Sequence, residues 1–294
     1  MGKIVTKMAK TYVNKGVEIE LPAAYDELEE ASLQAIEETI APYPKTQRMF
    51  ALLVADPEVR ANWDMADYIA VTKLNFNDHG EVHAKVTAAS AVKMLSLLVE
   101  AGIAPDVVTS GAGDLDDAFL VVLTGALLHD IGNQVHRIHH AHWGVYLALP
   151  ILGKMLPQIY PEVEKQVELR GFILHAIHCH GFDPPPLTIE AALVAVADGT
   201  DMTKGRGRLA FDLGNINIHT VSALSIDKVF IARGTERPIA ITIQMSNSAG
   251  VFQVQETLAE KVLGGPLRDY ISVVATTLPE DVPTDARIVH SISL

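Results

Sequence analysis

Hydrophobic residues recur at helical spacing through the first two thirds of the chain. They predict helices over residues 25–40, 46–55, 57–73, 79–101, 115–131, 140–156, 161–179 and 188–202. Prolines and glycines fall between these segments, for example at 42–44 and 181–186, where they interrupt a helix. The pattern predicts a helical bundle over residues 46–208.

The pattern changes on both sides of this bundle. Residues 225–232 and 238–245 are rich in β-branched side chains, and the four residues from Gly234 to Arg237 between them predict a hairpin turn. A helix over 251–262 and a strand over 270–276 are expected to follow. We therefore expect a mainly α fold with a smaller C-terminal α+β unit over 209–294. Residues 1–45 are expected to form an N-terminal extension of short strands and one acidic amphipathic helix.

The composition indicates a globular protein with a large core. Of the 294 residues, 49% are hydrophobic, and a single cysteine, Cys179, excludes an internal disulfide. No uninterrupted apolar run reaches the length of about 18 residues that a membrane-spanning helix needs. These observations predict no membrane association and a reducing, cytoplasmic location.

The formal net charge of −13 comes without any block of basic residues. Contact with duplex nucleic acid needs a positive stripe, so we expect no such partner. A small phosphorylated substrate remains compatible with this charge, because a metal ion and a few cations can dominate the local field.

The most informative residues are His129 and Asp130, which end the apolar run 119–128. Imidazole and carboxylate are common metal ligands, and neither is easily buried without a partner. Other histidines and aspartates lie along the chain in an order that can complete a metal site. They are His83, His140, His175, His178, His180 and Asp198.

Three short stretches carry a resemblance to a known family. The run from Leu127 to Gly132 reads apolar-apolar-H-D-I-G, His83 begins the stretch HAKV, and Asp198 ends the stretch AVAD. Together they resemble the H…HD…D signature of the HD superfamily of metal-dependent phosphohydrolases over about residues 79–205. The resemblance implies that His83, His129, Asp130 and Asp198 bind one divalent metal ion.

Two further stretches resemble ribonuclease Y-like and HD-GYP-like members with two metals. They are HAHWGVYLA, which begins at His140, and AIHCHG, which includes His180. The resemblance implies that these two histidines bind a second ion and that Asp130 bridges both. On an uninterrupted helix, however, His175 and His178 share one face and His180 points away. These two therefore remain alternatives, as ligands or as groups that orient a ligand.

Three cationic residues are candidates for contacts to the substrate phosphate. HD-GYP-like members often have a lysine three residues after the aspartate, where this chain has Asn133. Arg137, one helical turn later, can replace that lysine, or it can be an ordinary surface arginine. Lys204 and Arg206 follow the last predicted ligand and form either a phosphate clamp or a hinge. The GYP tripeptide is missing, so activity on cyclic dinucleotides is not expected.

The resemblance implies cleavage of a phosphoester by metal-activated hydroxide, with Asp130 as ligand and orienter of the nucleophile. The substrate class would be a nucleotide, a phosphomonoester or a small phosphodiester. Imidazoles with carboxylates suit Fe, Mn, Co, Ni or Zn, at one or two divalent ions per chain. Two alternatives stay open, a di-iron oxygenase that cleaves a C–C or C–P bond and a non-catalytic sensor or assembly protein. An exposed strand edge in the C-terminal unit makes a homodimer an expectation.

Overall fold

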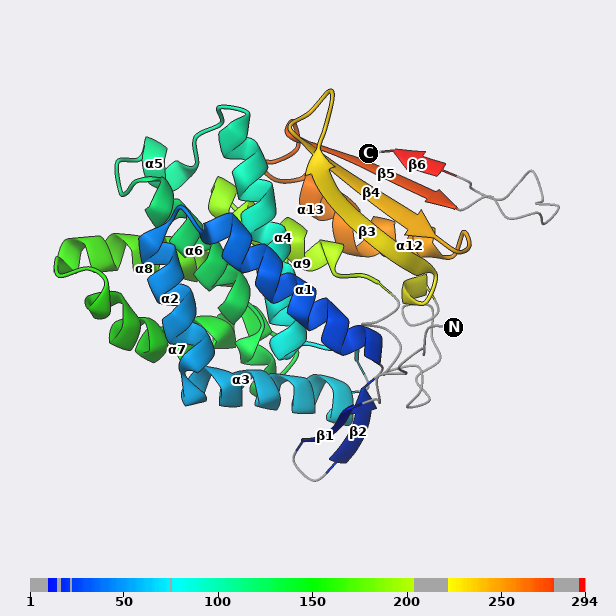
Figure 1. The fold of residues 1–294 in the computed structure, drawn as a ribbon, viewed down its shortest axis with the longest axis horizontal. Helices are drawn as coiled ribbons and strands as arrows, with labels where there is room; N and C mark the ends of the chain where they lie inside the picture. The colour runs from blue at the N-terminus through cyan, green and yellow to red at the C-terminus, as the bar shows by residue number, and fades with distance from the viewer. Residues whose placement is uncertain are drawn as a thin grey trace, which may run out of the picture.

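The computed structural model describes residues 10–14, 17–21, 23–74, 76–203, 222–277 and 291–293, with the main chain alone for 10–27 and 291–293. Within these residues a helical bundle packs against a smaller unit of strands and helices (Figure 1). The mainly α fold with a C-terminal α+β unit is therefore confirmed.

The helices of the bundle follow the predicted order. The main ones are α1 (Ala23–Ile40), α2 (Pro44–Ala55), α3 (Pro57–Asp67), α4 (Glu81–Glu100), α6 (Leu115–Leu128), α7 (His140–Met155), α8 (Val163–Cys179) and α9 (Ile189–Thr200). Shorter helical turns are η1 (Tyr68–Lys73), α5 (Asp106–Thr109), η2 (Ile131–Gln134) and η3 (Leu156–Gln158). Sequence periodicity missed α5, because four residues are too few to show a helical period.

Helix α6 lies at the centre of the bundle. Every residue from Asp117 to Leu128 is buried, and α2, α4, α8 and α9 all contact this helix. A helix that is apolar on all sides is stable only when other helices surround it. Its N-terminus is fixed by a capping box, in which the Asp114 carboxylate accepts from the Asp117 N–H and the Asp117 carboxylate accepts from the Asp114 N–H. The core position of α6 places His129, the residue that directly follows this helix, deep inside the protein.

Helix α4 is also largely internal. Among the described residues it is the one helix long and apolar enough to cross a membrane by length and composition. In its most apolar window, 61% of the residues are buried inside the protein.

The C-terminal unit has a four-stranded sheet in the order β3-β4-β5-β6. Its strands are β3 (Ile226–Arg233), β4 (Ile239–Met245), β5 (Ile271–Thr277) and β6 (Ser291–Ser293), and a two-stranded hairpin of β1 (Lys10–Asn14) and β2 (Val17–Leu21) precedes the bundle. Strands β3 and β4 are antiparallel, as the predicted hairpin requires, while β4 and β5 are parallel. The parallel connection runs through α12 (Gly250–Gln253), η4 (Val254–Ala259) and α13 (Glu260–Leu263).

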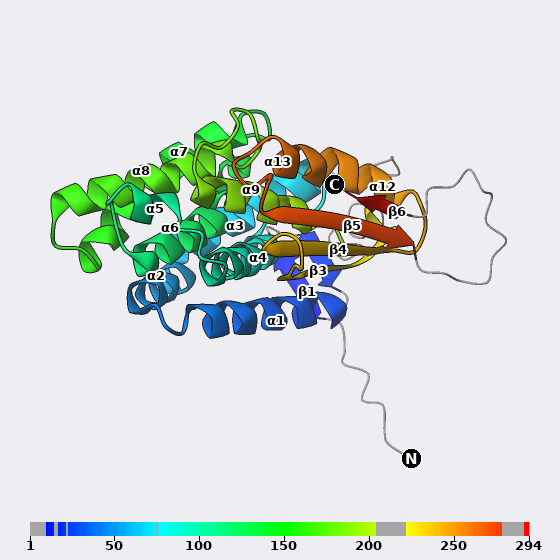
Figure 2. The same ribbon diagram turned by 90° about the horizontal axis from the view of Figure 1, so that it is seen from above.

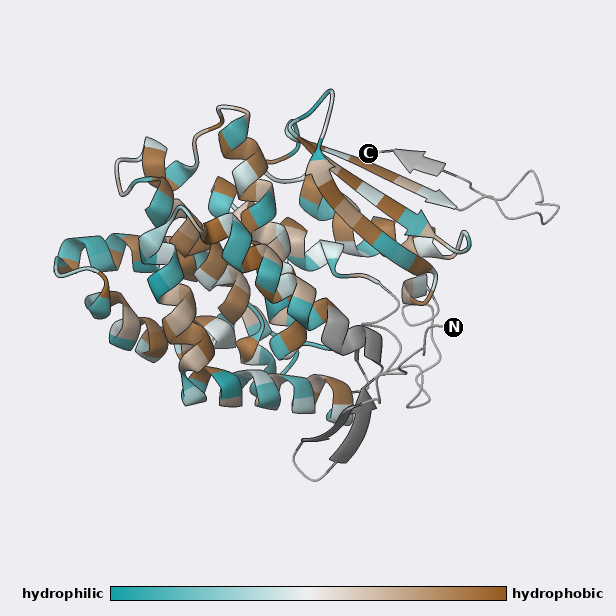
Figure 3. Cartoon of the chain, viewed as in Figure 1, coloured by the Kyte–Doolittle hydropathy of each residue, from teal (hydrophilic) through white to brown (hydrophobic). Residues whose placement is uncertain are grey.

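One face of the sheet carries the buried side chains, and the other face includes the exposed Phe230 and Val274. The helical segment from α12 to α13 lies along one face, and α4 contacts β3 and β4 from the bundle (Figure 2). Buried residues alternate with partly buried ones along β4, and hydrophobic and hydrophilic bands alternate along the strands (Figure 3). The segment η4–α13 also contacts α9, so the C-terminal unit lies against the helix that carries Asp198 in its last turn.

Asp117 is a buried ionic centre away from the histidines. Its carboxylate is paired with the ammonium groups of Lys45 at 2.6 Å and Lys165 at 2.7 Å, and it accepts a hydrogen bond from the hydroxyl of Tyr160 at 2.6 Å. Burial by itself would raise the pKa of Asp117, but hydrogen bonds from Lys165, Lys45 and Tyr160 lower it to about 2. This group therefore stabilises the folded state when it is charged.

Asp117→Asn is expected to lower the free energy of unfolding by about 3 kcal/mol at neutral pH, because the partly buried ammonium groups of Lys45 and Lys165 lose the buried carboxylate that they share. Since the folded-state pKa lies below the unfolded value, the contribution is complete above pH of about 4 and is lost as the pH falls towards 2. Urea unfolding at several pH values measures both effects. Lys154→Ala, which breaks a pair with Asp56 at a half-exposed lysine, should cost less than about 1 kcal/mol.

Candidate metal centre

His83 is held at the start of α4. The carboxylate of Asp78 accepts from the Gly80 N–H at 2.8 Å and from the His83 N–H at 3.1 Å, so it satisfies free donors of the first turn. The imidazole is fully buried, and its Nδ1 lies 2.7 Å from a carboxylate oxygen of Asp201. This contact fixes the ring and directs Nε2 away from Asp201.

Main-chain carbonyl groups orient the three other histidines among the predicted ligands, His129, His140 and His180. Nδ1 of His129 lies 2.7 Å from the carbonyl oxygen of Ala126, and Nδ1 of His180 lies 2.7 Å from that of Ile177. Nδ1 of His140 lies 3.0 Å from the carbonyl oxygen of Arg137. A carbonyl oxygen only accepts, so Nδ1 carries a proton in each ring, and the neutral form of each ring has its lone pair on Nε2.

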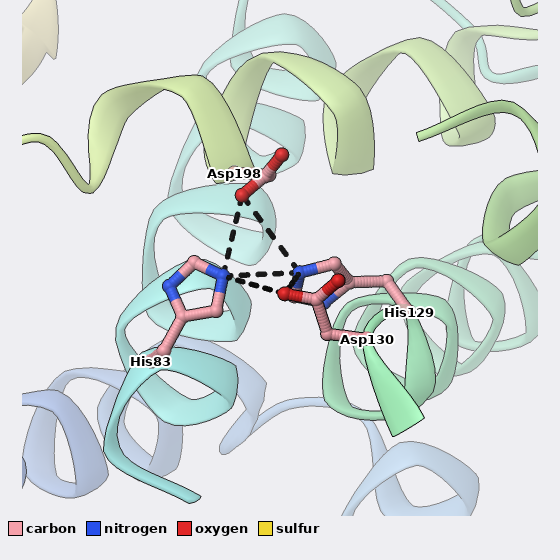
Figure 4. Close-up of side chains that lie close together, drawn as sticks. All are labelled: His83, His129, Asp130 and Asp198. Carbon is pink, nitrogen blue, oxygen red and sulfur yellow. Dashed lines mark hydrogen bonds and ion pairs between the residues drawn. The ribbon is translucent and has the colours of Figure 1, made fainter. Parts of the chain in front are cut away.

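These lone pairs converge with two carboxylates. Nε2 of His83 and Nε2 of His129 are 3.1 Å apart, and one oxygen of Asp130 lies 3.4 Å and 3.2 Å from them (Figure 4). An oxygen of Asp198 completes the group at 3.2 Å from His83 and 3.8 Å from His129. Four acceptors facing one another without a proton between them repel, unless a cation lies among them.

A second group shares Asp130 with the first. Nε2 of His140 and Nε2 of His180 are 2.9 Å apart. The other carboxylate oxygen of Asp130 lies 3.3 Å from His140 and 3.5 Å from His180. The two oxygens of one carboxylate thus face two different pairs of imidazoles, which is the arrangement of a bridging ligand.

The protonation states suit ligation. Burial, opposed only in part by the Asp130 carboxylate, lowers the pKa of His180 to about 4, so this ring is neutral at pH 7. Burial would raise the pKa of Asp130, but the imidazoles around it, that of His129 first, hold it well below its ordinary value. Burial likewise opposes ionisation of Asp198, and the charge of Lys261 keeps the pKa of this carboxyl well below its ordinary value. Neutral imidazoles with ionised carboxylates are the donor set that divalent transition metals prefer, so these residues fit such ions.

The structure brings together all six residues that the sequence singled out as metal ligands. They fall into the groups His83, His129, Asp130, Asp198 and Asp130, His140, His180, with ligand atoms within 4.8 Å of one another in each group. Ligation itself stays a prediction. His180 follows the last residue of α8 with dihedral angles that are still helical, so it continues the buried face formed by Ile173, Ala176 and Ile177, and only 2% of its surface is exposed.

His175 and His178 lie elsewhere. Nδ1 of His175 is 3.4 Å from Sγ of Cys179, and its Nε2 accepts from the Leu187 N–H at 3.0 Å. The ring of His178 packs edge-on against His142. The orienting role predicted for His175 and His178 is instead filled by Asp201 and by main-chain carbonyls, in contrast to the sequence interpretation.

Arg137 lies at the edge of the second group. Its guanidinium is 3.2 Å from Oδ1 of Asn133, 3.3 Å from Nε2 of His140 and 4.0 Å from a carboxylate oxygen of Asp130. It also lies over the ring of Phe76, and 37% of its side chain is exposed. Lys204 and Arg206, the other predicted phosphate contacts, lie outside the described residues.

Three residues near the site were missed. Asp201 orients His83, buried His79 lies with its ring 5.8 Å from that of His83, and Lys261 pairs with Asp198 at 2.6 Å. The three-residue spacing of Asp198 and Asp201 at the end of an apolar helix was a signal that could have identified Asp201. Lys261 is 63 residues away from its partner and carries no such signal.

His140→Ala is expected to lower the metal content from two ions per chain towards one. The change removes one of two imidazoles from the second group and leaves His83, His129 and Asp198 unchanged. Metal analysis after chelation and reloading measures the ratio. Exposed His136→Ala is the matched control and should keep the wild-type content, whereas two ions in His140→Ala would remove His140 from the ligands.

The comparisons with known proteins agree with this geometry. The family model of the HD domain matches residues 92–203, which include His129, Asp130 and Asp198 but not His83. The chain is 46% identical over 224 residues to the uncharacterized protein MJ1020 of Methanocaldococcus jannaschii, a match that covers 76% of this chain and 86% of that protein. No solved structure gives a significant match.

Proposed function

This chain belongs to the HD domain family, and from that premise we propose that it is a metal-dependent phosphohydrolase with two metal ions. The proposed substrate is a small phosphorylated molecule, either a phosphomonoester or a small phosphodiester. The observation that supports it most directly is the carboxylate of Asp130, whose two oxygens face two separate pairs of imidazoles.

Divalent metal ions bound there would supply Lewis acidity and a water of lowered pKa for attack on phosphorus. The residues of the chain hold that arrangement in place. The side-chain amide of Asn133 donates to one carboxylate oxygen of Asp130 at 2.8 Å and to its main-chain carbonyl at 3.0 Å. The aspartate therefore cannot rotate freely, and both of its oxygens keep their directions.

Arg137 gives the site a way to hold a phosphate. The guanidinium is planar and always charged, so it can donate two hydrogen bonds to phosphate oxygens. Its hydrogen bond to Asn133 holds it beside the second group, and its exposed fraction leaves donors accessible to a ligand. In a chain of net charge −13, such a local cation favours an anionic substrate at this point.

A substrate panel tests the proposal. Chelated protein is reloaded with Mn, Fe, Co, Ni, Zn or Mg and assayed on nucleotides, phosphomonoesters and small phosphodiesters. We expect hydrolysis with at least one transition metal and its loss with chelator. Oxygen uptake coupled to C–C or C–P cleavage, with no phosphate released from any ester, would contradict the proposal in favour of a di-iron oxygenase.

Arg137→Ala is expected to raise KM for the best substrate with a smaller effect on kcat, because a charge-assisted contact to phosphate is lost. The expected loss is about 1.5–3 kcal/mol of binding. Steady-state kinetics measure it, and metal content should stay at the wild-type value. Arg48→Ala, on the exposed face of α2, is the control. An unchanged KM in Arg137→Ala would assign phosphate binding to the metal ions alone.

A further inference from the structure

A side chain of the C-terminal unit, that of Lys261, contacts the metal centre. Lys261, on α13, places its ammonium 2.6 Å from Oδ2 of Asp198. The other oxygen of Asp198 lies 3.2 Å from Nε2 of His83. One carboxylate thus divides its oxygens between a lysine of the C-terminal unit and the histidines of the bundle.

Close helix packing fixes this lysine. Gly199, directly after Asp198, lies so near η4 that an added β-carbon would be 2.5 Å from the carbonyl oxygen of Thr257. The same position would be 3.3 Å from Cδ of Lys261, so the aliphatic part of the lysine lies across the glycine. The absence of a side chain at Gly199 therefore lets the ammonium reach Asp198.

The exposure of the pair separates it from an ordinary surface ion pair. The side chains of Lys261 and Asp198 are 13% and 17% exposed. Arg233 and Glu100 also join the C-terminal unit to the bundle, but their side chains are 66% and 47% exposed. A partly buried charged hydrogen bond restricts its carboxylate far more than an exposed pair does.

We propose that Lys261 is a positioning residue for Asp198. The C-terminal unit then contributes to metal binding, because it supplies the side chain that orients one of the predicted ligands. The ammonium holds Oδ2 and leaves Oδ1 to face the metal position beside His83 and His129. Loss of this contact removes a charged hydrogen bond that restricts rotation of the carboxylate about its Cβ–Cγ bond. The inference rests on the metal site of the proposed function but not on phosphoester cleavage.

The test is metal affinity in the full chain. Mn²⁺ or Co²⁺ is titrated against a competing chelator in the wild type, Lys261→Met, Lys261→Gln and Lys261→Arg. Removal of a group that orients a metal ligand weakens binding by about tenfold to a hundredfold. We expect that loss in the Met and Gln variants, and recovery of most of the affinity in Lys261→Arg, which restores a cationic donor. The absorption spectrum of bound Co²⁺ should change in the Met and Gln variants and return towards wild type in the Arg variant.

Arg233→Ala is the matched control, because it removes another ion pair between the two units, with Glu100, and touches no predicted ligand. Its metal affinity should equal that of the wild type. Circular dichroism establishes that each variant is folded. Two neutral replacements are used so that the conclusion does not depend on the behaviour of a single variant. Wild-type affinity and an unchanged Co²⁺ spectrum in a folded Met or Gln variant would overturn the proposal and leave Lys261 as a structural contact.

The metal titration of the Lys261 variants and the substrate panel can succeed or fail independently of each other. Metal binding without hydrolysis of any phosphoester would contradict the phosphohydrolase proposal, yet the titration would still decide the role of Lys261. Conversely, an active wild type whose Lys261 variants bind metal normally would overturn only the positioning role.

Discussion

Asp130→Asn is expected to abolish phosphoester hydrolysis, with a fall in kcat/KM of at least about a thousandfold, or about 4 kcal/mol of transition-state stabilisation. The two carboxylate oxygens of Asp130 face both pairs of imidazoles. An amide has no negative charge and only one acceptor oxygen, so it cannot serve both sides. The same substitution should reduce metal content, because the shared ligand of both groups is lost.

The fold should survive this substitution. The two side chains have nearly the same shape, and an amide can donate to an Nε2 lone pair that faces another acceptor in the metal-free protein. We therefore expect the unfolding temperature of the metal-free variant to equal or exceed that of the metal-free wild type. Asp269→Asn, at an exposed position of the C-terminal unit, is the control and should keep full activity. Activity within about tenfold of wild type in Asp130→Asn would contradict a bridging role.

The sequence predicted the bundle well because its signals are local. Helical periodicity and caps such as Asp114 and Gly80 act within a few residues, and the observed helices begin close to the predicted positions. The order of His83, His129, Asp130 and Asp198 likewise sufficed to propose one centre, since each stands in a short motif on a helix or at its end.

The remaining parts of the site depend on contacts that no local pattern records. His180 lies on the face of α8 that also carries the buried Ile173 and Ala176, but helical spacing alone does not say which face of α8 meets the cluster, so His175 and His178 remained as alternatives. The partnership of His83 with Asp201 joins residues 118 positions apart, and that of Lys261 with Asp198 joins residues 63 positions apart. Such pairs follow from how α4, α9 and α13 pack, and packing is not readable from hydrophobic spacing.

The glycine two residues after Asp130 shows how the backbone brings the two metal groups together. Gly132 lies in η2, where the chain passes directly against the first turn of α7. A β-carbon built on Gly132 would overlap the carbonyl oxygen of His140 and the main-chain nitrogen of Gly144. The contact partners are main-chain atoms of the helix that carries His140, so they cannot move aside as a flexible side chain can.

Gly132→Ala is therefore expected to separate α7 from η2, with a loss of about 3 kcal/mol or more in the free energy of unfolding. His140 should move with its helix, so the variant should also lose metal from the second group. Chemical denaturation and metal analysis measure the two effects. Gly153→Ala, on the same helix but with no atom within 4 Å of its added β-carbon, is the matched control and should be neutral or stabilising by up to about 1 kcal/mol. Wild-type stability together with two bound ions in Gly132→Ala would show that η2 and α7 need no such close approach, and that His140 is placed by other contacts.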